Sequence, residues 1–312
     1  MSLRGTKQSR TIQDYSFPCD CFVPSRDKDL IFYILAHKIL PQLDNNLPKK
    51  IWFLWLQGLD NAPLVVKKCY ESWIKHNPDW ELILLDEQSI AEYIPAFTDG
   101  VTKQALSDIL RINLLAKHGG IWVDATCFCM KPLDDWLYDN MQSGFFAFDK
   151  PGPDRMLSSW FIACNKYNYI ASTYQNMVNL YWQQNPHLKF IESSGWKFLN
   201  KRLQKLNTQV WFSAFVTNTL KVYPYFWFHY MFTNLYLRIK EFRDLWDITP
   251  KISADIPHRI QMTGLLAPMS AEVKQEIDNK ISPLYKLTWR YDTEAAHKPD
   301  TVLDYLFNNC DQ

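Results

Sequence analysis

Three charged residues in the middle of the chain combine types and spacing that suit the binding of a divalent metal ion and a diphosphate. Asp108 and Arg111 are three residues apart in a helical pattern, so they share one helix face. Asp124 is the first charged residue after the β-favouring run 121–123. Open α/β sheets bind ligands at the carboxyl ends of their strands. We therefore expect the two carboxylates and the guanidinium to meet at that edge of a sheet.

The helix that positions this pair is predicted over residues 102–117. Lys117 and His118 stand at its end, where cations interact favourably with the helix dipole. Gly119 and Gly120 can adopt the left-handed backbone that closes a helix. Helical spacing relates the apolar residues of this segment, namely Ala105, Leu106, Ile109, Leu110, Ile112, Leu114 and Leu115.

Strands and helices alternate through the first half of the sequence, which is the pattern of a doubly wound α/β domain. The predicted order is strand 50–56, helix 64–76, strand 81–85, helix 88–93, helix 102–117 and strand 121–123. Later predicted elements are strands 145–148 and 160–163 and helices 171–185, 196–206 and 212–220. A further apolar helix is predicted at 29–43. The chain is thus divided into an N-terminal arm, 1–28, and a single α/β domain, 29–312.

Composition limits the classes of function that the chain can serve. A net charge of +1 over 312 residues argues against a general nucleic-acid binder. Aromatic residues make up 15% of the chain, which favours contact with glycans or with a membrane surface. Residues 1–10 are polar and basic, so we expect no signal peptide and a cytoplasmic location, with association at the inner face of the membrane as an option.

Two other patterns have ordinary structural explanations. The aromatic segment 222–239 is predicted to be a buried helix, with an interfacial membrane contact as the alternative. The chain has seven cysteines, including the pairs Cys19/Cys21 and Cys127/Cys129. Zinc sites prefer a wider spacing, so we expect these thiols to serve as small core residues.

Several segments, taken together, resemble the capsular polysaccharide synthesis glycosyltransferases. These are relatives of the sugar transferases with a DxD motif, which include the yeast initiating mannosyltransferase and the catalytic domains of large clostridial toxins. The resemblance is good over residues 48–136 and continues more weakly through Trp160, His229 and residues 286–289. The segments that carry it are 51–58 with Ala62-Pro63, 107–111, 119–126 and 131–136.

The resemblance implies an α/β fold with a GT-A-like (Rossmann-like) nucleotide-sugar-binding domain and additional C-terminal helices. Residues 48–136 would form the donor-binding core, and residues 137–312 the acceptor side with an aromatic helical lobe. Asp108, Arg111 and Asp124 would be the catalytic residues. The donor would contact Trp55, Gln57, Gly58, Asp108, Arg111, Gly120 and Asp124.

The resemblance also implies a Mn²⁺ or Mg²⁺ ion at the DxD motif. Asp124 would take the first position of that motif, but the third position is Thr126 and not an acid. Hard divalent cations prefer oxygen ligands, and a hydroxyl can still hold a metal-bound water. The alternative is that a Lys or Arg neutralises the leaving group, in which case a metal would be dispensable.

Five further residues are weaker candidates for contact with the acceptor or the diphosphate. Asp149 and Asp154 flank a predicted turn at 150–153. His229 lies among aromatic residues, and His258 lies in a segment with the composition of a loop. Lys286 belongs to an alternating segment near the C-terminus. The plain alternatives are a solvated turn for Asp149 and Asp154, a core histidine for His229 and a surface lysine for Lys286.

The function that follows from the resemblance is transfer of a hexose from a nucleotide-sugar to a glycan or lipid-linked acceptor. The pathway would be bacterial capsule or other surface-polysaccharide synthesis, and the wider group implies retention of configuration. The alternative is a pseudoenzyme of the same fold that binds glycan without chemistry. The sequence has no Gly-x-Gly-x-x-Gly after its first strand and no Gly-Lys-Ser/Thr loop, which argues against a Rossmann oxidoreductase and a P-loop enzyme.

Overall fold

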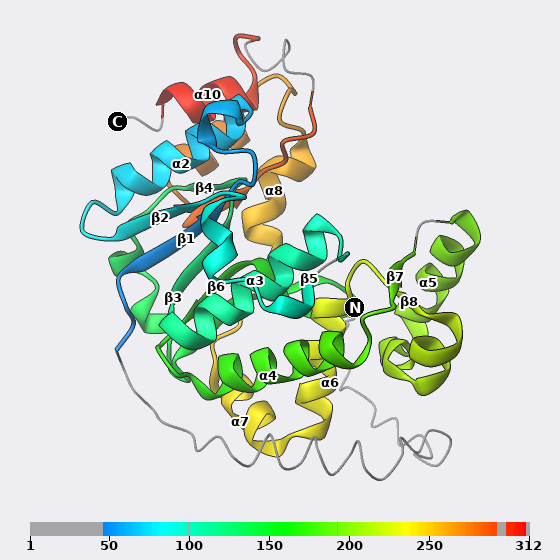
Figure 1. Cartoon of the computed structure of the whole chain (residues 1–312). Helices are drawn as coiled ribbons and strands as arrows, with labels where there is room; N and C mark the ends of the chain where they lie inside the picture. Colours follow the sequence, from blue (N-terminus) through cyan, green and yellow to red (C-terminus); the bar gives the residue numbers. More distant parts are fainter. Residues whose placement is uncertain (1–45, 99, 192, 292–297, 310–312) are drawn as a thin grey trace, which may run out of the picture.

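The computed structural model describes residues 46–98, 100–191, 193–291 and 298–309 (Figure 1). The predicted arm 1–28, the predicted helix 29–43 and the Cys19/Cys21 pair lie outside the described residues.

The centre of the fold is a mixed five-stranded sheet with the order β2-β1-β3-β6-β5. Its strands are β2 Glu81–Leu85, β1 Lys50–Leu54, β3 Gly120–Asp124, β6 Arg155–Cys164 and β5 Phe145–Gly152. β1 pairs in parallel with both β2 and β3, whereas β6 is antiparallel to β3 and to β5. The α/β class predicted from the sequence is confirmed.

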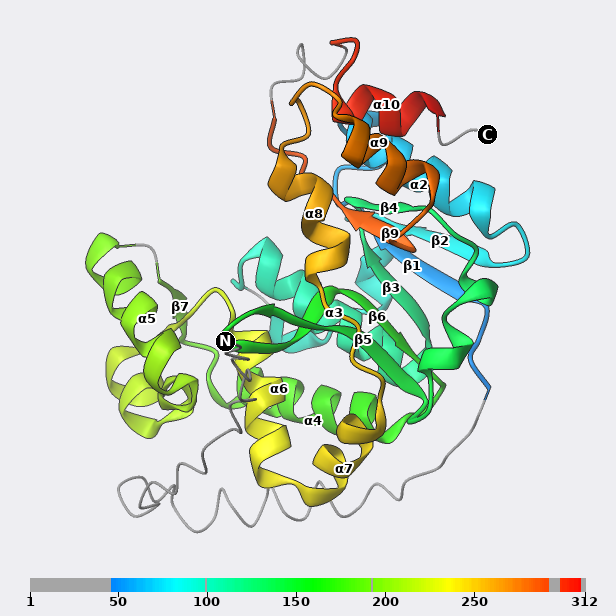
Figure 2. The same cartoon turned by 180° about the vertical axis from the view of Figure 1, so that it is seen from behind.

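Helices cover both faces of this sheet, because successive strand residues point to opposite sides. Trp52, Trp122 and Ile162 enter one hydrophobic cluster, whereas Phe53, Val123 and Phe161 enter the other. The first cluster is completed by α3 Lys103–His118, α4 Tyr169–Gln184, α6 Trp227–Arg238 and α7 Lys240–Ile248. The second contains residues of α2 Leu64–His76, α8 Asp255–Thr263, α9 Ala271–Asp278 and α10 Val302–Asn309. Figures 1 and 2 show the sheet between these two groups of helices.

Two separate two-stranded sheets lie outside the central sheet. β4 Cys127–Cys129 pairs antiparallel with β9 Leu284–Lys286. The strand that directly follows β3 therefore meets a segment from the C-terminal part of the chain. β7 Lys189–Phe190 pairs in parallel with β8 Val222–Tyr223. Between β7 and β8 the chain forms α5 Ser194–Leu206 and two short helical segments, Thr208–Phe212 and Phe215–Leu220.

The segment 131–136, one of those that carry the family resemblance, has a structural role here. The Asp134 carboxylate accepts a hydrogen bond from Trp80 Nε1 at 3.0 Å and pairs with Lys49 Nζ at 2.7 Å. These contacts hold the start of β1 and the start of β2 against the loop that follows β4.

The structure reproduces some predicted elements and changes others. Strand 81–85 and helix 64–76 have the predicted bounds. The helix predicted at 88–93 is only a 3₁₀ turn, Ser89–Glu92, and the one predicted at 212–220 is replaced by a 3₁₀ segment and a six-residue π-helix. Helices α7 to α10 were not predicted; all four have nine residues or fewer, which is too short for a clear helical period.

The prediction that His258 lies in a loop is wrong, because this residue belongs to α8. Pro257 gives the segment its loop-like composition. Proline is tolerated in the first turn of a helix, where its missing N–H has no intrahelical partner to lose. The helix therefore begins at Asp255 despite the proline.

The aromatic segment 222–239 is part of the core rather than an interfacial helix. It starts as β8, and the helix α6 begins only at Trp227, after Pro224. Eight of the twelve residues of α6 are buried. Among the described helices, none is long and apolar enough to cross a membrane. The described cysteines Cys69, Cys127, Cys129 and Cys164 are free and buried, as predicted for core residues.

The two glycines after α3 set the angle between this helix and β3. Gly119 has φ +68° and Gly120 has φ +90°, both in the left-handed region. A Cβ atom on Gly120 would lie 2.6 Å from the Lys50 carbonyl oxygen. Only glycine lets β3 approach β1 this closely at its first residue.

We predict that Gly120→Ala lowers the free energy of unfolding by about 3 kcal/mol or more, because backbone strain adds to a backbone clash. Gly58→Ala should cost about 1 to 2 kcal/mol, since Gly58 has φ +76° but nothing within 4 Å of its would-be Cβ. Gly195→Ala, in a helix with open space around it, should be neutral or stabilising by up to about 1 kcal/mol. Urea unfolding measures all three, and equal costs for Gly120 and Gly195 would contradict the account.

Candidate active site

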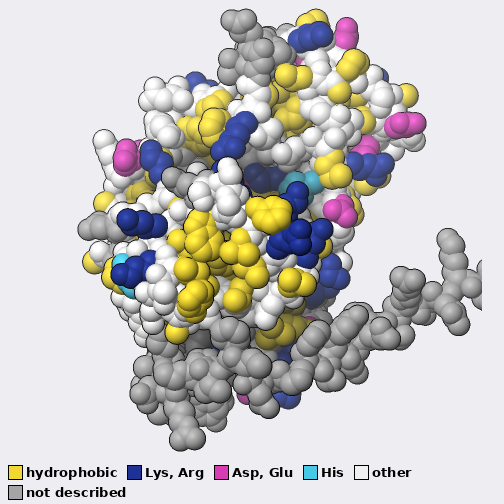
Figure 3. All heavy atoms as spheres, turned by 90° about the vertical axis from the view of Figure 1, so that its right-hand side faces the viewer, with side chains coloured by type: hydrophobic (Ala, Val, Ile, Leu, Met, Phe, Trp, Pro, Cys, Tyr) yellow, Lys and Arg dark blue, Asp and Glu magenta, His cyan; other side chains and the backbone are white. Residues whose placement is uncertain are grey.

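A cavity of about 710 Å³ lies at the carboxyl ends of β1 and β3. Leu54 and Asp124, the last residues of these parallel strands, are register partners and both line it. The face in Figure 3 is hollowed near its centre, with Lys, Arg and His side chains visible in the hollow. The ligand site predicted from the sequence lies at this edge of the sheet.

Arg111 lines the cavity and contacts both acids of the site. Its Nη2 atom is 3.1 Å from Asp108 Oδ1, and its Nη1 atom is 3.3 Å from Asp124 Oδ1. The guanidinium also donates to the Ser159 carbonyl and to Ser107 Oγ, and it lies over the Trp122 ring at 4.9 Å. The three residues that the sequence predicted to meet do meet.

Asp124 is held on the α3 side of the sheet by its own strand. Trp122 and Asp124 are two residues apart on β3, so both point to the same face. Trp122 Nε1 donates to Asp124 Oδ1 at 3.1 Å. The second carboxylate oxygen, Oδ2, faces Lys286 Nζ at 3.6 Å.

Lys286 reaches this carboxylate through the small β4–β9 sheet. Its register partner is Cys127, and the neighbouring Leu287 amide donates to the Thr126 carbonyl at 2.7 Å. The Lys286 ammonium donates to Thr126 Oγ1 at 2.5 Å. The Lys286 ammonium is therefore fixed between Asp124 and Thr126.

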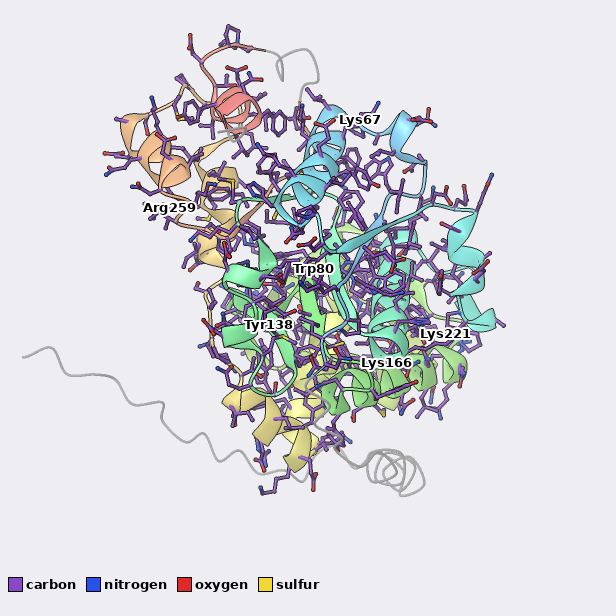
Figure 4. All side chains as sticks on the ribbon, turned by 90° about the vertical axis from the view of Figure 1, so that its left-hand side faces the viewer. Lys67, Trp80, Tyr138, Lys166, Lys221 and Arg259 are labelled. Carbon is purple, nitrogen blue, oxygen red and sulfur yellow. The ribbon has the colours of Figure 1, made fainter. Side chains whose placement is uncertain are left out.

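The buried Glu276 carboxylate links β9 to the neighbouring helices. Tyr285 donates its hydroxyl hydrogen to Glu276 Oε1 at 3.4 Å, and Arg259 Nε is 2.9 Å from Glu276 Oε2. Arg259 extends from α8, as labelled in Figure 4. These contacts join α8, α9 and β9 in one unit, so the position of Lys286 depends on the C-terminal helices.

The two carboxyl groups of the site differ in their proton affinity. Burial raises the pKa of Asp108 to about 7, although Arg111 opposes the rise; the negative charge of Asp124 adds to it. Burial alone would also raise the pKa of Asp124, but the positive charges of Arg111 and Lys286 outweigh it and hold that pKa below its ordinary value. Asp124 is therefore ionised at neutral pH, whereas Asp108 titrates near it.

Both candidate histidines line the cavity. Burial, together with the charges of Arg155 and Arg111, lowers the pKa of His229 to about 3, so this ring is neutral. Among the described residues, its Nδ1 atom has no hydrogen-bond partner. His258 Nδ1 lies 2.8 Å from the Ala254 carbonyl oxygen, and burial also lowers the pKa of His258. A neutral His229 can bind a hydroxyl group but is a poor base.

Four of the predicted site residues do not line the cavity, namely Gly58, Gly120, Asp149 and Asp154. Gly58 follows the lining residue Gln57 and shapes the loop after β1. Gly120 is a packing residue between β3 and β1. The Asp149 amide and carbonyl bond to Ile252 and Ala254. For Gly58, Gly120 and Asp149 the backbone position, which the sequence pattern does not reveal, decides the role.

Asp154 acts on the cavity indirectly, through a residue that the sequence did not indicate. It sits in the two-residue turn between β5 and β6 and pairs with Arg155 Nε at 3.2 Å. Tyr230 donates to its other oxygen at 2.6 Å. The Arg155 guanidinium then lies over the Phe226 ring at 3.9 Å and lines the cavity. No sequence motif points to Arg155, because its position at the cavity depends on the β5–β6 turn and on packing against Phe226.

Positive charge exceeds negative charge along the described cavity wall. The basic residues that line it are Lys103, Arg111, Arg155, Lys286 and Arg290, against the acids Asp108 and Asp124. Aromatic residues form much of the remaining wall, namely Trp55, Trp122, Trp160, Tyr225, Phe226 and Trp289. The Trp55 and Trp289 rings meet edge to face at 6.2 Å. The cavity therefore suits an anion joined to flat or ring-shaped groups.

Comparison with known proteins identifies the family. The family model described as capsular polysaccharide synthesis protein matches residues 27–191 and 197–306. The chain belongs to this family. The membership predicted from the sequence motifs is thereby confirmed.

Several curated relatives of this capsular polysaccharide synthesis family member are named as glycosyltransferases. The O-glycosyltransferase braB of Annulohypoxylon truncatum is 26% identical over 159 residues, which are 43% of this chain and 38% of that protein. The initiation-specific alpha-1,6-mannosyltransferase of Saccharomyces cerevisiae is 27% identical over 123 residues, which are 34% of this chain and 26% of that protein. The chain thus matches well under half the length of these relatives. Both are fungal, so a bacterial origin stays a prediction.

A solved structure, the PaToxG glycosyltransferase, matches with 15% identity over 70% of this chain and 84% of that chain. Its TM-score of 0.33 is too low to define a fold. The fold class follows instead from the sheet and its two helical layers.

The oxygens that would hold a Mn²⁺ or Mg²⁺ ion are already paired with cationic or N–H donors. Asp124 Oδ1 faces Arg111 and Trp122, Asp124 Oδ2 faces Lys286, and Thr126 Oγ1 accepts from Lys286. Within the described ranges, no group of three or more His, Cys, Asp or Glu side chains could hold a metal ion. The donor set does not fit a metal held by the protein, because an ammonium group occupies the space between the two expected ligands.

We predict that Asp108 makes stability depend on pH in a defined direction. The folded chain holds the Asp108 proton more tightly than the unfolded chain, whose carboxyl has the ordinary pKa of 3.8. The contribution of Asp108 to the free energy of unfolding is therefore fully present below about pH 4 and is lost as the pH rises to about 7, by at most about 4 kcal/mol.

Urea unfolding of the unsubstituted chain and of Asp108→Asn between pH 4 and pH 8 measures this effect, because other titrating groups cancel in the difference. The stability of the unsubstituted chain relative to the variant should fall over this interval and level off above pH 7. A difference that stays constant with pH would show that Asp108 is ionised throughout.

Proposed function

We propose that this chain is a glycosyltransferase that moves a sugar from a nucleotide-sugar to a glycan or lipid-linked acceptor in capsular or other surface-polysaccharide synthesis. One observation carries the proposal. Two cations from distant segments, Arg111 and Lys286, converge on Asp124 at the carboxyl edge of the sheet, inside a cavity that is net positive. That arrangement suits the diphosphate of a nucleotide-sugar.

The main chemical task in such a transfer is to stabilise the diphosphate as it leaves. The bond between the sugar carbon and the phosphate oxygen breaks, and negative charge grows on that oxygen. The positive charges of the Arg111 guanidinium and of the Lys286 ammonium, both of which line the cavity, would stabilise that negative charge. In this proposal the oxygens of Asp124 hold the two cations in place and do not contact the donor.

We propose that these two side chains supply the positive charge that the resemblance assigns to a divalent metal. Together they carry two positive charges, the same as one Mn²⁺ or Mg²⁺ ion. Both are fixed before a donor arrives, because Arg111 also bonds to Ser107 and Ser159, and Lys286 is set by the β4–β9 register. Fixed charges of this kind need little reorganisation during the reaction.

We assign one part of the cavity wall to the donor and another part to the acceptor. Trp55 and Trp289 meet beyond the end of β1, where a nucleobase could lie against an aromatic face. Arg155, Phe226 and His229 line the wall formed by β6 and α6. The neutral His229 ring there can bond to a sugar hydroxyl. Retention of configuration stays a prediction.

The first test is binding of UDP-, GDP- and CMP-sugars by calorimetry, with EDTA or with Mn²⁺. We expect at least one UDP- or GDP-sugar to bind in EDTA, and Lys286→Gln to weaken it about 10- to 100-fold, since one charged hydrogen bond is lost. Lys240→Gln is the matched control, because Lys240 is 72% exposed on α7 and does not line the cavity. Binding that requires Mn²⁺ and ignores Lys286 would refute the role of Lys286.

The second test separates an enzyme from a glycan-binding pseudoenzyme. We expect slow release of the nucleoside diphosphate from the bound nucleotide-sugar, detected by chromatography, and at least about a 100-fold loss in Asp124→Asn, because Arg111 and Lys286 lose their shared anchor. Circular dichroism checks that the variant is folded. Affinity for glycan with no affinity for any nucleotide-sugar would favour the pseudoenzyme.

A further inference from the structure

Helix α5 is the most exposed helix of the described chain, and its composition is unusual. It contains four basic residues, Lys197, Lys201, Arg202 and Lys205, and no acidic residue. None of its thirteen residues is buried. Three of its apolar side chains are largely exposed, with Phe198 at 63%, Leu199 at 41% and Leu206 at 81%.

Only a few side chains of α5 pack against the rest of the protein. Trp196 and Leu203 pack against a small cluster of buried residues, namely Ile191, Trp211, Val216 and Tyr230. The outer side carries two adjacent rows at i, i+4 spacing, Lys197-Lys201-Lys205 and Phe198-Arg202-Leu206. Like charges at this spacing repel one another, so the lysine row weakens the isolated helix. Among the described residues, no acidic side chain pairs with any of the four basic residues of α5.

The helix lies beside the mouth of the cavity. Phe226 packs against the same small cluster as Trp196 and also lines the cavity. Phe190 of β7, just before α5, meets the ring of Tyr225, another lining residue, at 6.3 Å. Figure 1 shows α5 projecting from the body of the molecule, and Figure 3 shows apolar side chains on this face with Lys and Arg on both sides of them.

We infer that the outer side of α5 binds the surface of an anionic lipid bilayer. Basic side chains attract acidic headgroups, and exposed Phe and Leu side chains can enter the region between headgroups and acyl chains. Both properties occur on one side of one helix. Nucleic acid would use the charges but not the apolar side chains, and the net charge of +1 for the whole chain gives it no other support.

This inference does not depend on the proposed function, but bilayer binding by α5 would bring the cavity close to the membrane surface. A bilayer in contact with α5 would lie next to Tyr225 and Phe226 at the cavity mouth. An acceptor anchored in that bilayer could reach the cavity without leaving the membrane. The apolar α6 segment, in contrast, is buried and unavailable for such a contact.

The experiment is sedimentation of the full chain with vesicles of phosphatidylcholine alone or with about one third phosphatidylglycerol. We expect binding to the anionic vesicles only. Lys201→Gln with Arg202→Gln should lower the partition coefficient roughly 25-fold, or about five-fold for each basic side chain. The matched control is Lys117→Gln with Lys274→Gln, which removes the same charge from α3 and α9 and should change binding by less than about two-fold.

A second pair of variants tests the apolar side chains. Phe198→Ser with Leu206→Ser keeps every charge, so it should still bind anionic vesicles at low salt but lose binding at high salt, where charge attraction is screened. Melting temperatures and nucleotide-sugar binding should match those of the unsubstituted chain, which separates this result from the proposed function. Binding that ignores lipid charge, equal loss in the charge control, or a dimer formed through α5 without lipid would overturn the inference.

Discussion

The ionised Asp124 carboxylate between two cations is the interaction on which the site depends. Arg111 comes from α3, and Lys286 comes from a strand 162 residues further along the chain than Asp124. A partly buried carboxylate is stabilised by nearby cations, and here the fold brings two of them to Asp124. Each cation is fixed by other bonds, Arg111 by Ser107 and Ser159 and Lys286 by the pairing of β4 with β9. The candidate site is therefore formed by two distant parts of the chain that meet at the end of one strand.

This cluster also explains the electrostatic division within the cavity. The cations hold Asp124 ionised, whereas burial leaves Asp108 with a pKa of about 7. The surplus of positive charge favours an anionic ligand, and the Lys286 ammonium fills the space between Asp124 and Thr126. Where other members of the wider group are expected to use a second acid and a metal, this chain has a hydroxyl and a lysine. The proposed replacement of a metal ion by Lys286 balances charge, because one acid is absent and one cation is added at the same site.

The second constraint is the close approach of α3 to the sheet. Gly119 and Gly120 let the chain turn from helix to strand within two residues, so Asp108, Arg111 and Asp124 come together across a short span. Trp52 Nε1 donates to the Gly119 carbonyl and ties β1 to the same turn. The cavity opens beside a basic, exposed helix, α5, which belongs to a small lobe with its own cluster of buried residues. The proposed chemistry and the proposed bilayer contact thus belong to different parts of the fold, the sheet edge and the projecting α5 lobe.

The sequence by itself determined the parts whose signals are local. Helical spacing located α2 and α3, apolar runs located β1 to β3, and the family motifs located Asp108, Arg111 and Asp124. Alternation and composition could not show that His258 lies on a helix, that Asp154 serves Arg155, or that the segment 222–239 begins as a strand. Those outcomes depend on register and on contacts between residues far apart in the chain. Only the tertiary structure brought Lys286 to Thr126, because a lysine on an alternating segment has no partner until another strand pairs beside it.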